Sequence, residues 1–121
     1  MQLRSKIFNS DPAFSACLAK DSAHILPGSS GFHVACIQFA LVILDGARIA
    51  QKEMNQALYG PTTANSVRNY KRRRKIINPA YQTKADNIVG KMTIAQLDSD
   101  MHLNEAIAQA AGQNIQFQFQ E

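Results

Sequence analysis

Three histidines and two cysteines are the side chains of this sequence best suited to bind a metal or to act as a nucleophile. His24, His33 and His102 show neither the i, i+4 pair of a helical zinc site nor a close pair of cysteines. His33 and Cys36 are three residues apart, but two ligands do not complete a metal site, and we interpret them as a surface imidazole and a buried thiol. No nucleophile motif or glycine-rich phosphate loop is present. We therefore expect a protein that is not an enzyme and uses no metal or cofactor.

A run of five consecutive cations, from Lys71 to Lys75, is the strongest local charge. The whole chain has a formal net charge of +4, but outside this run the acids slightly outnumber the remaining cations. Three interpretations are open. The cations can complement the negative end of a helix dipole, bind a carboxylate-rich polymer through arginine forks, or bind the phosphates of a nucleic acid. The last is weakened by the few aromatic residues nearby, Tyr70 and Tyr81.

Length and composition predict one globular domain. The chain has 121 residues, of which 45% are apolar and 18% charged, as is ordinary for a folded protein with a single core. The first residues lack the apolar run of a secretion signal, and no segment reaches the ~18 apolar residues of a membrane helix. The chain is therefore expected to be soluble, with no visible export signal and no membrane contact.

Capping residues and apolar spacing predict the first two helices. Ser10 or Asp11 can cap a short helix that has Pro12 at its first position, and the glycines and proline of residues 26–31 then break the chain. A second helix is expected over about 33–45, closed by Gly46. Its apolar residues form two sets on different faces, so we expect it to be central. These sets are Val34, Ile37, Leu41 and Leu44, and Cys36, Phe39, Ala40 and Ile43.

The first helix is the natural cover for the second of these faces, which would bring Cys17 near Cys36. Two cysteines are compatible with one disulfide bridge or with two buried thiols. Residues 47–58 fit either a short helix or an ordered loop.

Two glycine-then-threonine corners predict the remaining helices. After Gly60 and Pro61, Thr62 or Thr63 is expected to cap a third helix that ends at residues 76–78. Its inward residues are expected to be Ala64, Val67 and Tyr70. After Gly90, Thr93 is expected to cap a final helix that runs through Ala111 and is ended by Gly112, with Ile94, Leu97 and Met101 inward. Ile88 and Val89 can pair briefly as a strand or fill the core, and the alternating tail 114–121 has the period of a strand.

These segments resemble the peptidoglycan-binding domain of cell-wall hydrolases, a compact three-helix fold. The resemblance covers about residues 31–98, with a preceding helix and a C-terminal extension as additions. Asn87 stands where the family usually has glycine, and the basic run replaces a glycine-ended helix. The matching positions are Gly31, Val34, Ile37, Gln38, Leu41 and Gly46; Tyr59, Gly60, Thr63, Val67 and Tyr70; and Asp86, Val89, Gly90, Thr93 and Leu97.

The resemblance implies an all-α three-helix bundle with an extra N-terminal helix over 1–30, a binding domain over 31–101, and a helical extension and tail over 102–121. It also implies a non-catalytic module that binds the glycan or stem peptide of peptidoglycan through a shallow polar groove, anchoring a catalytic domain or another partner at the wall. Candidate ligand-binding residues are Tyr59, Thr62, Tyr70, Arg73, Arg74, Tyr81, Asp86 and Lys91. Of these, Tyr59 and Tyr70 are also expected to seal the core.

Two other functions remain open from the sequence. The alternating tail suggests a protein-interaction adaptor, since such a segment can add as a strand to another protein. Binding of nucleic acid through residues 71–75 is less favoured. The family implies a location in the periplasm or the cell wall. Because no signal peptide is visible, we expect the protein either to use a non-classical export route or to stay in the cytoplasm before release.

Overall fold

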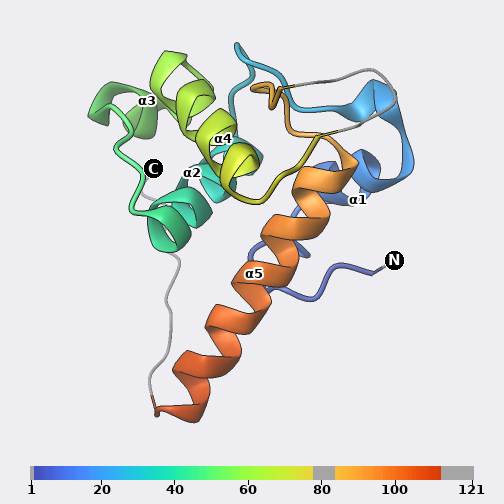
Figure 1. Ribbon diagram of the computed structural model, residues 1–121, viewed down its shortest axis with the longest axis vertical. Coiled ribbons are helices and arrows are strands. Elements are labelled where there is room, and N and C mark those ends of the chain that lie inside the picture. Colours follow the sequence, from blue (N-terminus) through green and yellow to red (C-terminus); the bar gives the residue numbers. More distant parts are fainter. Residues whose placement is uncertain (1, 78–83, 113–121) are drawn as a thin grey trace.

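The computed structural model describes residues 2–77 and 84–112 and shows an all-α bundle (Figure 1). Within these residues there is no β-strand, in agreement with the fold class predicted from the sequence. Tyr81 and the tail 113–121 lie outside the described residues. The elements are α1 (Pro12–Ala19), a 3-10 turn (Asp21–Ala23), α2 (Phe32–Asp45), α3 (Gln51–Gln56), α4 (Pro61–Arg73) and α5 (Lys91–Ala110).

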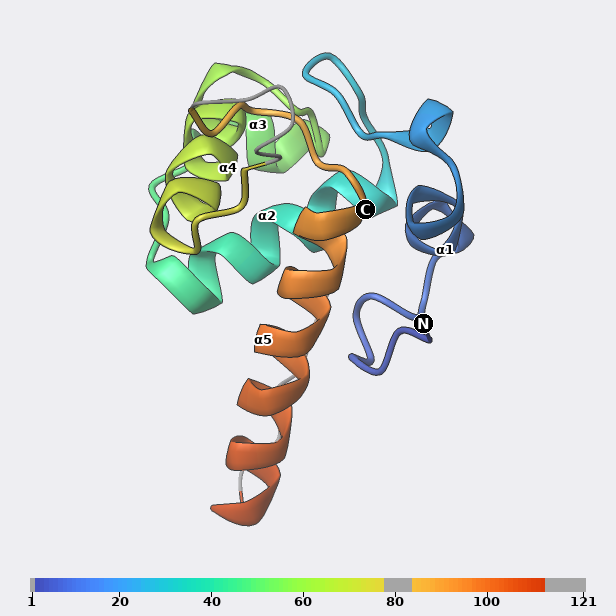
Figure 2. The ribbon, with the colours of Figure 1, turned by 45° about the vertical axis from the view of Figure 1, so that its right-hand side comes forward.

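Helix α2 lies at the centre, with α4 and α5 both packed against it (Figure 2). Val34, Ile37 and Leu41 are completely buried, as the apolar spacing predicts. On the second face Cys36 is equally buried, but Ile43 near the end of the helix is 40% exposed. The helix is therefore central along its first turns and reaches solvent at its C-terminal end.

Helix α1 is capped as expected but packs chiefly on α5 rather than on α2. The Asp11 side chain accepts a hydrogen bond from the backbone N–H of Ala13, and Pro12 occupies the first turn. The Cys17 thiol donates to the carbonyl of Val89, while Cys36 lies against Ser10. Both thiols are free, and burial raises the pKa of Cys17 to about 11 and that of Cys36 to about 12. They are two inert, protonated thiols at neutral pH.

The N-terminal segment belongs to the same core as the rest. Two carboxylates of α5 hold its backbone, because Asp98 accepts from the N–H groups of Arg4 and Ser5, and Glu105 accepts from the Ser5 hydroxyl and the Lys6 N–H. The boundary at residue 101 falls inside α5, which continues without a break to Ala110. The segment adds Leu3, Ile7 and Phe8 to the buried cluster.

A short extended segment joins the two glycine corners. Ile25 forms an antiparallel bridge with Val89, and Ser30 forms another with Leu58. The first bridge has N···O distances of 2.9 and 3.0 Å, and the Val89 side chain is completely buried. Val89 therefore does both things that the sequence left open as alternatives, since it pairs in a bridge and fills the core. The pairing places the starts of α4 and α5 beside the entry to α2.

The threonines do not cap these helices, contrary to the sequence prediction. The N-cap residues are Gly60 for α4 and Gly90 for α5, and neither helix has a side-chain cap from its own N-cap residue. At α4 the cap comes from a different helix. The buried carboxylate of Glu53, on α3, accepts hydrogen bonds from the N–H groups of Thr62 and Thr63 at 3.0 and 2.8 Å and from the Thr62 hydroxyl at 2.6 Å.

Close approach, rather than unusual backbone angles, explains the glycine at this corner. Gly60 has a φ of −96°, which any residue can adopt. A Cβ atom there would lie only 2.7 Å from the Glu53 carboxyl carbon. Gln38 completes the junction from α2, donating to the Leu58 carbonyl and to the Thr63 hydroxyl, both at 3.0 Å. Glu53 and Gln38 together thus join α2, α3 and α4, and the Glu53 carboxylate fits only because residue 60 has no side chain.

Helix α4 ends earlier than predicted, because Lys75 adopts a left-handed conformation. The last helical residue is Arg73, and Lys75 has a φ of 56°. The Ile76 N–H then bonds back to the Lys71 carbonyl at 2.8 Å, and the Ile76 side chain is buried. This is the hydrogen bond and apolar contact of a Schellman-type helix end, here with lysine in the position usually held by glycine.

The substitution Glu53→Gln tests the cap. Burial raises the pKa of Glu53, but the hydrogen bonds from Thr62 and Thr63 outweigh it and lower the pKa to about 2. The carboxylate therefore contributes its full stability above the ordinary value of 4.5 and loses it as pH falls toward 2. At pH 7 the variant should lose about 1–3 kcal/mol of unfolding free energy, measured by urea denaturation.

The difference between wild type and this variant should shrink between pH 4.5 and 2. The exposed neighbour Lys52 provides a control, because Lys52→Gln should leave stability within about 0.5 kcal/mol of wild type. An equal loss in E53Q at every pH would contradict the assigned role of the charge.

Candidate functional site

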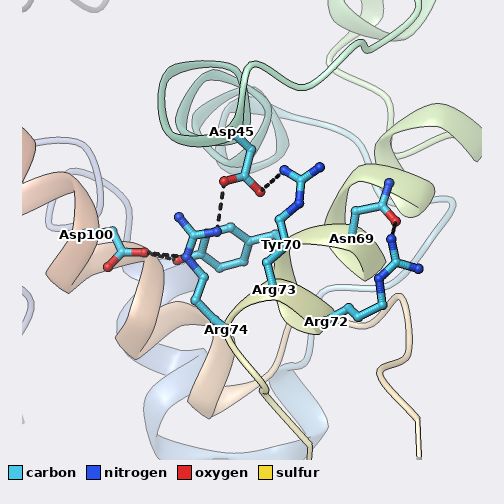
Figure 3. A network of polar contacts seen from close by, with 7 residues as sticks. All are labelled: Asp45, Asn69, Tyr70, Arg72, Arg73, Arg74 and Asp100. Carbon is cyan, nitrogen blue, oxygen red and sulfur yellow. Dashed lines mark hydrogen bonds and ion pairs between the residues drawn. The ribbon is translucent and has the colours of Figure 1, made fainter.

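The basic run does not form one patch, because its members point to different parts of the protein (Figure 3). Arg73 and Arg74 both reach Asp45 at the end of α2. Arg74 also contacts Asp100 on α5, whereas Arg72 lies on the other side of α4 beside Asn69. The run is therefore divided between internal ion pairs and a solvent-facing side.

The Arg74 cluster is the most highly connected of these contacts. Its guanidinium donates to Asp45 at 2.8 Å and to Asp100 at 3.1 Å, and it lies over the ring of Tyr70 at 4.1 Å from the centroid. The Tyr70 hydroxyl donates to the same Asp100 carboxylate at 2.6 Å. Burial and the Asp100 carboxylate raise the pKa of Tyr70, so the phenol stays neutral. The second oxygen of Asp45 has no hydrogen bond but lies 3.3 Å from Arg73.

Lys71 fixes the loop that leads into α5. The side chain is buried, forms an ion pair with Asp86 and donates to the Ile88 carbonyl at 2.8 Å. Asp86 also accepts from the Ile88 N–H at 3.1 Å. Tyr59 completes this junction by donating its hydroxyl to the Asn87 carbonyl. Burial, with a smaller contribution from Asp86, raises the pKa of Tyr59.

The candidate ligand-binding residues from the sequence therefore occupy separate places. Arg73 and Arg74 meet at Asp45, and Arg74 and Tyr70 meet at Asp100. Tyr59 and Asp86 meet at the loop before α5, Thr62 binds Glu53, and Lys91 is exposed in the first turn of α5. Tyr81 lies outside the described residues. The prediction that Tyr59 and Tyr70 seal the core is confirmed, since they are 1% and 0% exposed.

A second group of polar residues lies on the outer face of α4 and was missed by the sequence reasoning. Asn65, Arg68 and Arg72 are exposed, and Asn69 between them is half-buried. Their spacing of three or four residues places them in one row along the helix. The Arg72 guanidinium donates to the Asn69 side-chain carbonyl at 2.9 Å. We call these four residues the α4 ridge. The signal for this row is the spacing of three or four residues, which crosses the run of five consecutive cations only at Arg72.

Within residues 2–77 and 84–112, no three histidine, cysteine or acidic side chains gather as a metal site would require. Among the same residues, no helix is both long and apolar enough to cross a membrane.

Comparison with known proteins found no match to this chain among protein-family models, curated proteins or solved structures.

Two matched substitutions within the basic run test the division of its charges. Arg74→Gln leaves the buried Asp45 carboxylate without its closest partner and should lower the unfolding free energy by about 1–3 kcal/mol. Arg72→Gln removes the same group from an exposed position and should change the unfolding free energy by less than about 0.5 kcal/mol. Urea denaturation of both variants measures the difference. Equal, small effects would show that the ion pairs of Arg74 contribute nothing to folding.

Proposed function

We propose that this protein is a non-catalytic module that binds peptidoglycan and holds an associated activity at the bacterial cell wall. The observation that carries the proposal is the pair of glycine-then-threonine corners. They lie at the starts of two helices that both pack on α2, in the order and spacing of the peptidoglycan-binding pattern. The apolar positions of that pattern are buried, as a shared fold requires. They are Val34, Ile37, Leu41, Tyr59, Val67, Tyr70, Val89 and Leu97.

Binding would combine hydrogen bonds to the glycan or stem peptide with attraction between surface cations and wall carboxylates. Tyr59 and Tyr70 are buried and their hydroxyls are engaged within the protein, so they support the fold rather than touch the polymer. Contact falls to exposed polar side chains, which gives weak affinity for each site. Repetition of the epitope along the polymer raises the overall strength of attachment.

Sedimentation with purified sacculi tests this proposal. At low salt the protein should pellet with sacculi, and added salt should release part of it because exposed ion pairs are screened. The protein without sacculi and an unrelated protein of similar charge serve as controls. If the protein stays in the supernatant at low salt, the wall-binding function is wrong.

A protein-interaction adaptor is the second candidate, and the far half of α5 favours it. This helix extends well beyond the body of the molecule (Figure 2). Leu103 and Ile107, one turn apart, are each 61% exposed there. Exposed apolar residues at this spacing suit a partner with an apolar groove.

The double substitution Leu103→Gln with Ile107→Gln tests the adaptor function. If a partner binds this face, the changes should abolish a stoichiometric complex seen by size exclusion, because they replace the exposed apolar contacts. Met92→Gln changes a residue that is 51% exposed at the other end of α5 and should leave the complex intact. Removal of residues 114–121 tests the tail separately. If the complex elutes unchanged both with the double substitution and with the tail removed, neither α5 nor the tail is the interaction surface.

A further inference from the structure

We infer that the α4 ridge is the surface that binds the wall, and that the ligand group it takes is a carboxylate. This inference rests on the proposed function and names the residues and the chemistry of its site. It differs from the sequence prediction, whose eight candidate ligand-binding residues include Arg73 and Arg74 but neither Arg68 nor Arg72.

Most acids of the protein are engaged in internal contacts. Asp11 caps α1, Glu53 caps α4, and the pair Asp98 and Glu105 holds the N-terminal segment. The remaining described carboxylates bind the basic run, through Lys71, Arg73 and Arg74. These carboxylates are Asp45, Asp86 and Asp100. Asp21 and Glu121 are the two acids whose side chains the structure does not describe.

No carboxylate in the described part of the chain therefore neutralises Arg68 or Arg72. Helix α4 itself contains no acidic residue at all. Arg68 and Arg72 stand one helical turn apart, which is about 5–6 Å. The bond to Asn69 orients the Arg72 guanidinium, and a fixed planar fork binds a carboxylate better than a freely rotating one. The ridge thus holds two exposed arginines, one helical turn apart, that no described carboxylate neutralises.

The chemistry of the ridge favours carboxylates over nucleic acid. Proteins that bind single-stranded nucleic acid combine cations with aromatic side chains on which the bases stack. The only aromatic residue of α4 is Tyr70, which is completely buried. Asn65 and Asn69 instead add amide groups, which can hydrogen-bond peptide or sugar groups beside each carboxylate. A polymer with regularly spaced carboxylates, such as the stem peptides of peptidoglycan, complements this row.

The double variant Arg68→Gln with Arg72→Gln tests the inference in the sacculus assay. Its affinity should fall by about tenfold or more, the value of one to two charge-assisted hydrogen bonds. The matched control, Arg4→Gln with Lys6→Gln, removes the same charge from the N-terminal segment and should stay within about twofold of wild type, because loss of net charge alone has a small effect at an exposed site. Urea denaturation of both variants verifies that they are folded. Amidation of the sacculus carboxyl groups should weaken wild type as much as the substitutions do.

The outcomes separate this inference from the proposed function. If wild type and R68Q/R72Q pellet equally, the ridge is not the binding surface, although wall binding stands. If wild type does not pellet at all, wall binding fails, and poly-glutamate and a single-stranded oligonucleotide become the probes. Ridge-dependent binding to poly-glutamate would still support a carboxylate site. Binding to the oligonucleotide alone, or to neither probe, would overturn it.

Discussion

The contact between Glu53 and the first turn of α4 is the interaction on which the rest of the structure depends. A buried carboxylate is costly unless hydrogen bonds replace its water. Here the N–H groups of Thr62 and Thr63 do so, and the positive end of the helix dipole adds to their effect. Because Gln38 joins the same corner from α2, this contact fixes α3, α4 and the central helix relative to one another. It also explains why residue 60 is glycine.

Other carboxylates of the protein are also engaged in internal contacts. The carboxylates of the described side chains cap helices, hold the N-terminal backbone or bind Lys71, Arg73 and Arg74. Net positive charge is therefore left on the exposed cations of the surface, and two of these, Arg68 and Arg72, lie one turn apart on the outer face of α4. The formal charge of +4 says little about partners by itself. Its distribution becomes informative only after the internal ion pairs are known.

The sequence predicted those features that depend on neighbouring residues. Apolar spacing located α2 and α5, and local chemistry limited the cap of α1 to Ser10 or Asp11, of which Asp11 is the cap, and placed Gly46 at the end of α2. It failed where the partner is distant in the chain. The cap of α4 comes from another helix, and Arg74 binds residues 29 and 26 positions away. Five consecutive cations look like one surface patch, although helical geometry turns them toward different neighbours.

The two glycine corners show how the fold supplies a rigid surface. At α5 the corner is set by the bridge between Ile25 and Val89, and the ring of His24 packs against Gly90. At α4 both ends are held by charge: Glu53 fixes the first turn, and Asp45 with Asp100 fixes the last through Arg74. A helix anchored at both ends loses little conformational entropy when its exposed side chains bind a ligand. The ion pairs of Arg74 and the proposed ligand contacts of the α4 ridge are therefore complementary. The ion pairs hold the end of α4 in place, and a fixed helix presents the ridge side chains to a ligand at a lower entropy cost.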